Sequence, residues 1–181
     1  MLTQSQRQLL LSIARRSIEA VLDGRRPEVD VSGLDEVLTR PSGAFVSLHT
    51  STSDLRGCIG SIEAVAPLHQ AVSSSAINAA FRDPRFFPVT RDELATLHVE
   101  ISVMSPIETV TDVAEIEVGR DGLIISRGGR AGLLLPQVAT EYGWDRDTFL
   151  AQTCRKAGLA EDAWRTPGTK IERFSAEVFG E

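Results

Sequence analysis

Cysteine is scarce in this chain of 181 residues, which contains two. A disulfide scaffold is therefore not what holds the fold together, and a chain of this length buries roughly 70% of its unfolded surface without one. Lysine is equally scarce, because Lys156 and Lys170 are the only lysines among 19 basic residues. Genomic composition is the favoured explanation for this arginine bias, and anion recognition is the alternative.

Long hydrophobic runs are absent, although 42% of the residues are hydrophobic. No segment approaches the ~20 apolar residues that a membrane-spanning helix needs, so no membrane association is expected. The first seven residues are polar where a secretory signal has an apolar core. We therefore expect a soluble, cytoplasmic protein whose cysteines are reduced.

Positive charge is also in deficit, since the formal net charge is −6. Binding to nucleic acid needs clustered basic residues, so nucleic acid is not an expected partner. The sequence contains neither an HExxH motif nor paired CxxC motifs. Such motifs supply metal ligands, so no metal and no cofactor are predicted.

Helical spacing of apolar residues predicts three main helices. The first covers Thr3–Leu22, with Thr3 and Gln6 as a capping box, and is followed by a surface connection over 25–31. The second follows Pro67 and reaches Ala79. The third runs from the cap Asp145 to Ala157 and places Cys154 on its apolar side.

Alternating apolar residues and turn signals predict the strands. The ranges are 43–50, 55–63, 98–104, 116–118, 123–126, 132–135 and 170–179. The first two form an expected hairpin across the turn at 51–54. Hairpins mixed with separate helices favour the α+β class, with a mostly antiparallel sheet and flanking helices.

Residues 55–60, Leu-Arg-Gly-Cys-Ile-Gly, carry the strongest chemical signal. In an extended strand Arg56 and Cys58 project from the same face. A fixed cation beside a thiol favours the thiolate, which is the nucleophilic form. Gly57 and Gly60 are typical of a bulge or of a close approach by another backbone. Arg56 and Cys58 are therefore the predicted catalytic residues.

The chain resembles the AMMECR-one domain family, known in prokaryotes as AmmeMemoRadiSam system protein A. The resemblance covers residues 43–181 and extends to the amino-terminal helix. It rests on four motifs in order: Leu-Arg-Gly-Cys-Ile-Gly at 55–60, Ala-Ala-Phe-Arg-Asp-Pro-Arg-Phe at 79–86, Gly-Leu-Leu-Leu-Pro-Gln-Val-Ala at 132–139 and Lys-Ala-Gly-Leu at 156–159.

This resemblance implies one domain over residues 1–181, with a large and a small lobe separated by a cleft. It implies that Arg56, Gly57 and Cys58 line or support the cleft. The predicted substrate-binding residues are Gly57, Gly60, Arg82, Asp83 and Arg85. It also implies Memo-type and radical SAM proteins as partners. Some relatives have histidine where this chain has Asp121, which favours a structural turn there.

Each predicted site residue also has a structural interpretation. A lone cysteine such as Cys58 is commonly just packed, and Cys154 is expected in the core. Arg56 is equally consistent with an ordinary surface ion pair. Residues 81–88 contain two prolines and are expected to form a rigid loop. The favoured role for Arg82, Asp83 and Arg85 is to hold this loop by salt bridges. His69 is the first candidate for a catalytic base, although an inert histidine is favoured.

Two functions follow from these residues. The first is a cytoplasmic cysteine-dependent enzyme, or enzyme component, that acts on a small anionic or acyl substrate in the inter-lobe cleft. The alternative is a non-catalytic binding module for a small acid, a peptide, or a Memo-type or radical SAM partner, in which Cys58 only fills space. The substrate, the reaction and the oligomeric state are left open by the sequence.

Overall fold

The structure is a computed structural model that describes residues 1–30 and 32–181. Residue 31, the last of the predicted connection, lies outside the described residues. The described chain contains six α-helices and seven strands, which confirms the α+β class. It divides into two compact units: unit 1 comprises Met1–Met104 and Glu177–Glu181, and unit 2 comprises Ser105–Ala176.

Unit 1 is built on an antiparallel sheet whose edge is β2 (Leu55–Ser61). β1 (Ala44–His49) pairs with β2 on one side and with β3 (His98–Met104) on the other. The carboxyl end of β7 (Lys170–Gly180) continues the sheet beyond β3. The predicted hairpin and the predicted bounds of β3 are therefore confirmed.

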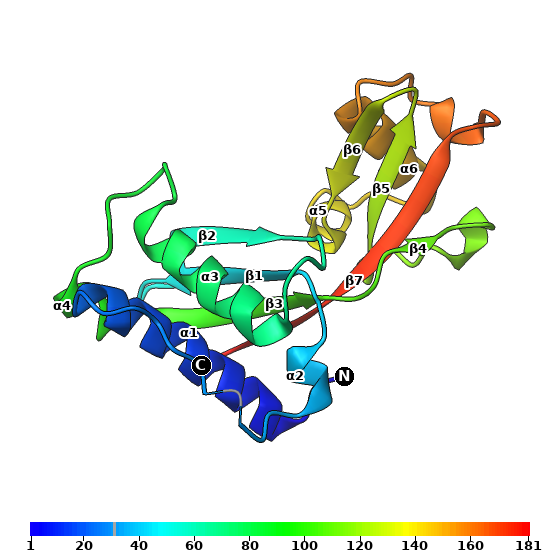
Figure 1. The fold of residues 1–181 in the computed structure, drawn as a ribbon. Coiled ribbons are helices and arrows are strands. Elements are labelled where there is room, and N and C mark those ends of the chain that lie inside the picture. Colours follow the sequence, from blue (N-terminus) through cyan, green and yellow to red (C-terminus); the bar gives the residue numbers. More distant parts are fainter. Residues whose placement is uncertain (31) are drawn as a thin grey trace. The chain divides into compact units, whose positions relative to one another are not determined.

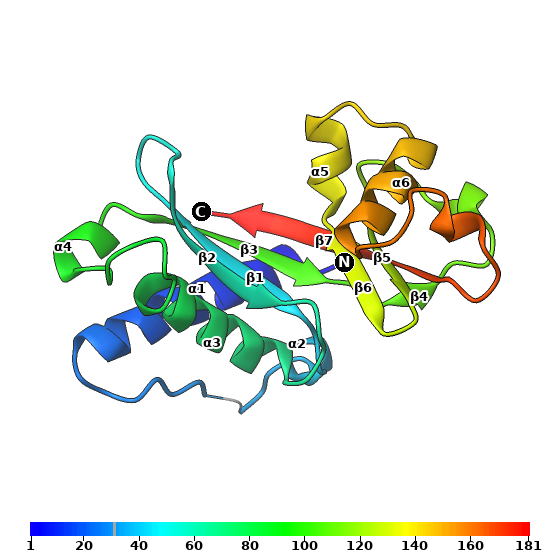
Figure 2. The same ribbon diagram turned by 90° about the horizontal axis from the view of Figure 1, so that it is seen from above.

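Helices α1 (Gln4–Leu22) and α3 (Leu68–Phe81) cover one face of this sheet (Figures 1 and 2). Thr3 and Gln6 form the predicted capping box. The helix-facing side chains of β1 and β3 are fully buried: Val46, Leu48, Val99 and Ile101. Because side chains alternate along a strand, the intervening residues of β1, β2 and β3 project from the other face. Two short helices complete unit 1, α2 (Glu36–Thr39) and α4 (Arg91–Leu94).

Unit 2 contains β4 (Glu108–Thr109), β5 (Asp121–Arg127), β6 (Arg130–Leu134) and the first part of β7. Its helices are α5 (Pro136–Glu141) and α6 (Arg146–Lys156), and α6 packs on β5 and β6 (Figure 1). Asp145 caps α6 as predicted. Cys154 lies in the unit 2 core together with Phe149 and Leu150, as expected from the helix pattern.

The predicted strand at 116–118 is wrong. The chain instead forms a 3-10 turn at Val113–Glu115, and the next residue, Ile116, is buried in the unit 2 core. The carbonyl oxygen of Ile116 accepts a hydrogen bond of 2.8 Å from Arg146 Nε. The Ile116 carbonyl oxygen is thus bonded by a side chain of α6 and not by a neighbouring strand. The local sequence gives no signal for this long-range contact. The sequence pattern also missed the two-residue strand β4 and a 3-10 turn at Ala163–Arg165.

The described residues include no helix whose length and hydropathy would let it cross a membrane. The predicted cleft between lobes stays a prediction, and each unit is considered separately below.

Candidate functional site around Cys58

Cys58 lies in the middle of β2, the edge strand of the unit 1 sheet. Its neighbour Gly57 faces helix α3, and a Cβ atom there would lie 2.2 Å from the carbonyl oxygen of Ala79. This confirms the close backbone approach predicted from the glycines. Since Gly57 points toward the helices, Cys58 points away from them. The thiol is therefore partly exposed on the face that the helices leave free.

The main chain of Cys58 is held on the free edge of the sheet. Its N–H donates to Asp83 Oδ2 at 2.9 Å, and Arg85 Nη2 donates to its carbonyl oxygen at 3.4 Å. When both main-chain groups of a strand residue point outward, the residue opposite on the next strand forms a non-hydrogen-bonded pair, whose side chains lie close. That residue is Ser47, and its hydroxyl donates to Cys58 Sγ at 3.2 Å.

Asp83 and Arg85 form the clamp that holds this edge. Asp83 is 4% exposed, and Arg85 pairs with it through two hydrogen bonds of 2.9 and 2.7 Å. The Arg85 guanidinium holds the pKa of Asp83 well below its usual range, and the N–H groups of Cys58 and Arg85 lower it further. The salt bridge expected in this loop is thus present between Asp83 and Arg85, and Asp83 also binds the main chain of Cys58.

A β-bulge lies at Arg56, and its guanidinium is engaged by Glu93 and Phe87. Leu48 pairs with Gly57 but His49 pairs with Leu55, so Arg56 is the extra residue in β2. Its Nε donates to Glu93 Oε1 at 3.0 Å, and its Nη2 donates to the carbonyl oxygen of Phe87 at 3.0 Å. Activation of the thiol by Arg56 stays a prediction, whereas the guanidinium that contacts Cys58 belongs to Arg85.

Arg56 and Arg85 meet at one aromatic ring. Their guanidinium carbons lie 5.8 and 5.4 Å from the centre of Phe86. Arg56 Nη1 is buried and has no hydrogen-bond partner in residues 1–30 and 32–181. The two cations thus belong to one cluster beside Cys58.

The other predicted residues are placed in different surroundings. Gly60 lies against β1, where a Cβ atom would come within 2.4 Å of Phe45 Cα. Arg82 is exposed just after α3. His69 is 3% exposed, and its Nδ1 is hydrogen-bonded to the carbonyl oxygen of Leu38, so it is a satisfied core histidine. Cys58 and Cys154 are both free thiols, and burial raises the pKa of Cys154.

Sequence reasoning missed three residues of this region: Ser47, Glu93 and Glu100. Strand register alone brings Ser47 opposite Cys58 and Glu100 opposite Ser47. Glu93 carried a recognisable signal, since it forms a capping box with Thr90, but that pattern gives no hint that its carboxylate also pairs with Arg56.

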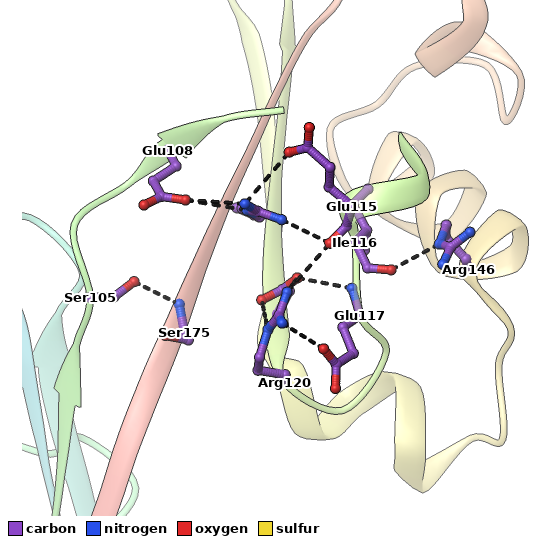
Figure 3. Close-up of polar contacts among 10 residues, drawn as sticks. Ser105, Glu108, Glu115, Ile116, Glu117, Arg120, Arg146 and Ser175 are labelled. Atoms are coloured by element: carbon purple, nitrogen blue, oxygen red, sulfur yellow. Dashed lines mark hydrogen bonds and ion pairs between the residues drawn. The ribbon is translucent and has the colours of Figure 1, made fainter. Parts of the chain in front are cut away.

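A second polar cluster lies in unit 2, around a cavity of about 210 Å³ (Figure 3). Arg120 pairs with Asp121 and Glu117, and Arg173 pairs with Glu108 and Glu115. Burial raises the pKa of Asp121, but hydrogen bonds from Arg120 and the Glu117 N–H outweigh burial and lower it. These ion pairs fix the turn before β5, which agrees with a structural role for Asp121.

The described part of the chain places no three His, Cys, Asp or Glu side chains where they could share a metal ion.

Comparison with known families finds a match to the AMMECR1 family over residues 11–179. Protein MJ0810 of Methanocaldococcus jannaschii is 43% identical, and the alignment covers 100% of this chain and 92% of that protein. Protein TK0174 of Thermococcus kodakarensis is 45% identical over 96% of this chain and 89% of its own length.

A solved structure agrees with these sequence matches. The crystal structure of the uncharacterized protein PH0010 from Pyrococcus horikoshii superimposes with a TM-score of 0.77 at 42% identity. The match covers 95% of this chain and 89% of that one. The resemblance inferred from the four motifs is thereby confirmed, and the chain belongs to the AMMECR1 family.

Proposed function

We propose that the chain is a cysteine-dependent enzyme, or enzyme component, in which Cys58 attacks a small anionic or acyl substrate. The observation that carries the proposal is the setting of Cys58. Its sulfur is partly exposed and accepts a hydrogen bond from Ser47, and its main chain is fixed by Asp83 and Arg85. A hydroxyl that donates to sulfur favours the thiolate, and a fixed backbone holds the nucleophile in one orientation.

Acyl transfer is the reaction class that fits this setting best. The sulfur of Cys58 would form a bond to the acyl carbon while the bond to the leaving group breaks. The leaving group takes that electron pair and the proton that the thiol has lost. Water or another acceptor then attacks the thioester, and the sulfur leaves with its electron pair and regains a proton. Arg85 would hold an anionic substrate group, and the 55% exposure of its side chain supports this role.

A binding module is the second candidate, and one observation favours it. Phe87 is 88% exposed, directly after the ring of Phe86 that contacts two guanidiniums. Exposed aromatic residues next to arginines are typical of protein interfaces. Memo-type and radical SAM proteins, which the family resemblance suggested as partners, would then dock on this loop, and Cys58 would only fill space.

Acylation of the thiol separates the two candidates. We expect p-nitrophenyl acetate at neutral pH to acetylate Cys58, with release of p-nitrophenolate and a proton, because this thiol is exposed and oriented. Peptide mass spectrometry would locate the acetyl group, and Cys154, which is fully buried, serves as the internal control. The Cys58→Ser variant should lose the thioester and the fast release of p-nitrophenolate.

Acetylation confined to surface lysines would contradict the enzymatic proposal. So would a Cys58 that is acetylated no faster in the folded chain than in the chain unfolded by urea. A Cys58→Ser variant that still binds a partner while wild type forms no thioester would support the binding module.

A further inference from the structure

Three side chains form one row across the free face of the unit 1 sheet. Ser47 on β1 is opposite Cys58 on β2 and also opposite Glu100 on β3. All three lie on the face away from α1 and α3, because their strand neighbours Val46, Gly57 and Ile101 are buried on the helix side. Strand register thus places a thiol, a hydroxyl and a carboxylate side by side across three strands.

The spacing within the row follows from the ladder. Ser47 and Cys58 form the close, non-hydrogen-bonded type of pair, with 3.2 Å between Oγ and Sγ. The main-chain N–H of Met104 donates to the carbonyl oxygen of Gly43, so these two residues form a hydrogen-bonded pair between β3 and β1. Hydrogen-bonded pairs recur at every second residue, so Ser47 and Glu100 also form one. Ser47 and Glu100 are therefore about 5.5 Å apart between Cα atoms, a gap that a glutamate side chain spans.

We propose that Glu100 is the proton acceptor for Cys58 and that the Ser47 hydroxyl carries the proton between them. This inference rests on the proposed function. In the resting structure the Ser47 hydroxyl donates to Cys58 Sγ, so it must first turn toward the Glu100 carboxylate. As the sulfur attacks, its proton then passes to Ser47 Oγ while the hydroxyl proton of Ser47 passes to Glu100. The electron pair of the S–H bond stays on sulfur, and one negative charge moves from the carboxylate to the sulfur. The reverse transfer supplies the proton that the leaving group takes.

This arrangement acts during attack, when the proton leaves the sulfur as the new bond forms. Glu100 would then act as a general base, and such groups typically contribute a factor of about 10² to 10⁴ in rate.

The surroundings of Glu100 suit this role. Its side chain is 44% exposed, and its Oε1 lies 3.8 Å from His49 Nε2. Gly180 on β7 lies next to it without a side chain, and a Cβ atom there would be 3.7 Å from Glu100 Cβ. A cavity of about 420 Å³ is lined by Glu100 together with His49 and His98, so a transferred proton has a route to water.

The other charged groups near the row are neutralised or lie to one side. Beside Cys58, Asp83 pairs with Arg85, and Arg56 pairs with Glu93. Beside Glu100, the Glu181 carboxylate pairs with Arg15 from α1. His98 lies two residues before Glu100 on the same face of β3, and His49 two residues after Ser47 on β1. Glu100 is therefore the carboxylate in the row itself.

The pH dependence of Cys58 alkylation tests this assignment. With iodoacetamide, Glu100→Gln should lower the rate at pH 6 by about tenfold or more, because the general base is lost. At pH 10 hydroxide from the solvent can take the proton in place of a protein base, so the variant should stay within about twofold of wild type. Ser47→Ala should reproduce this pattern, and Ser47→Thr should restore the rate because it keeps the hydroxyl. Ser102→Ala, two residues along the same face, is the matched control and should change neither rate.

Three results would overturn the assignment: an unchanged rate at pH 6, a faster rate at pH 6, or an equal loss at both pH values. A faster rate would show that Glu100 only repels the thiolate, and an equal loss would show structural damage. The proposed function fails separately. If wild-type Cys58 at pH 6 reacts no faster than in the urea-unfolded chain, the thiol is not activated and the proposed function fails. If wild type reacts fast and Glu100→Gln reacts equally fast, only the role of Glu100 is excluded.

Discussion

Replacement of Gly57 by alanine is expected to destabilise the protein by about 3 kcal/mol, at the upper end of the usual cost of overpacking. The new methyl group would lie 2.2 Å from the carbonyl oxygen of Ala79, which is main chain of α3 and does not swing aside as a long side chain would. The strand and the helix must separate. For a chain of this size, we expect the melting temperature to fall by about 6–12 °C.

Thermal unfolding followed by circular dichroism measures this effect. Gly180→Ala is the matched control, because its Cβ would lie 3.3 Å from the nearest atom, the carbonyl oxygen of Val99. It should cost less than about 1 kcal/mol, the range expected when a neighbour yields slightly. A Gly57→Ala variant as stable as wild type would show that β2 does not approach α3 so closely.

Replacement of Asp83 by alanine is expected to cost a similar amount, about 3 kcal/mol, because each main-chain N–H that loses its acceptor costs about 1–3 kcal/mol. The substitution leaves the Cys58 N–H and the Arg85 N–H without their acceptor on the sheet edge. Asp83→Asn should cost less, since its amide oxygen still accepts one of these bonds. The matched control is Asp92→Ala, an exposed carboxylate on α4, with an expected change within about 0.5 kcal/mol.

The stabilisation by Asp83 should also depend on pH. Its pKa is lower in the folded chain than in the unfolded chain, so its contribution is complete above the unfolded value of about 3.9 and is lost as the pH falls toward the folded value. The difference in melting temperature between wild type and Asp83→Asn should therefore stay constant from pH 7 to pH 5 and shrink below about pH 4. A difference that grows on acidification would contradict the ion pair.

Much of the scaffold was predictable because its signals are local. The capping box at Thr3, the hairpin around 51–54 and the strand at 98–104 each depend on residues within a few positions of one another. The two glycines beside Cys58 correctly indicated a close backbone approach. The strand expected at 116–118 failed because Arg146, distant in sequence, binds the carbonyl oxygen of Ile116.

The site could be predicted only in part, for the same physical reason. Alternation in an ideal strand places Arg56 beside Cys58, but the bulge adds a residue at that point, and Glu93 supplies a competing carboxylate. Ser47 and Glu100 are 11 and 42 positions from Cys58, and register alone brings Ser47 opposite Cys58 and Glu100 opposite Ser47. Register is set by the buried face of a sheet, and a single sequence does not specify which strands pair.

The reactivity of the Cys58 thiol at neutral pH is the most direct measurement. The rate of its reaction with iodoacetamide at pH 7 would be compared between the folded chain and the chain unfolded in urea, with peptide mass spectrometry to separate it from Cys154. Activation by the Ser47 hydroxyl and the Arg85 guanidinium predicts a reaction about tenfold faster in the folded chain, despite partial burial. A folded-chain rate equal to or below the unfolded rate would show that Cys58 is a packed residue and not a nucleophile.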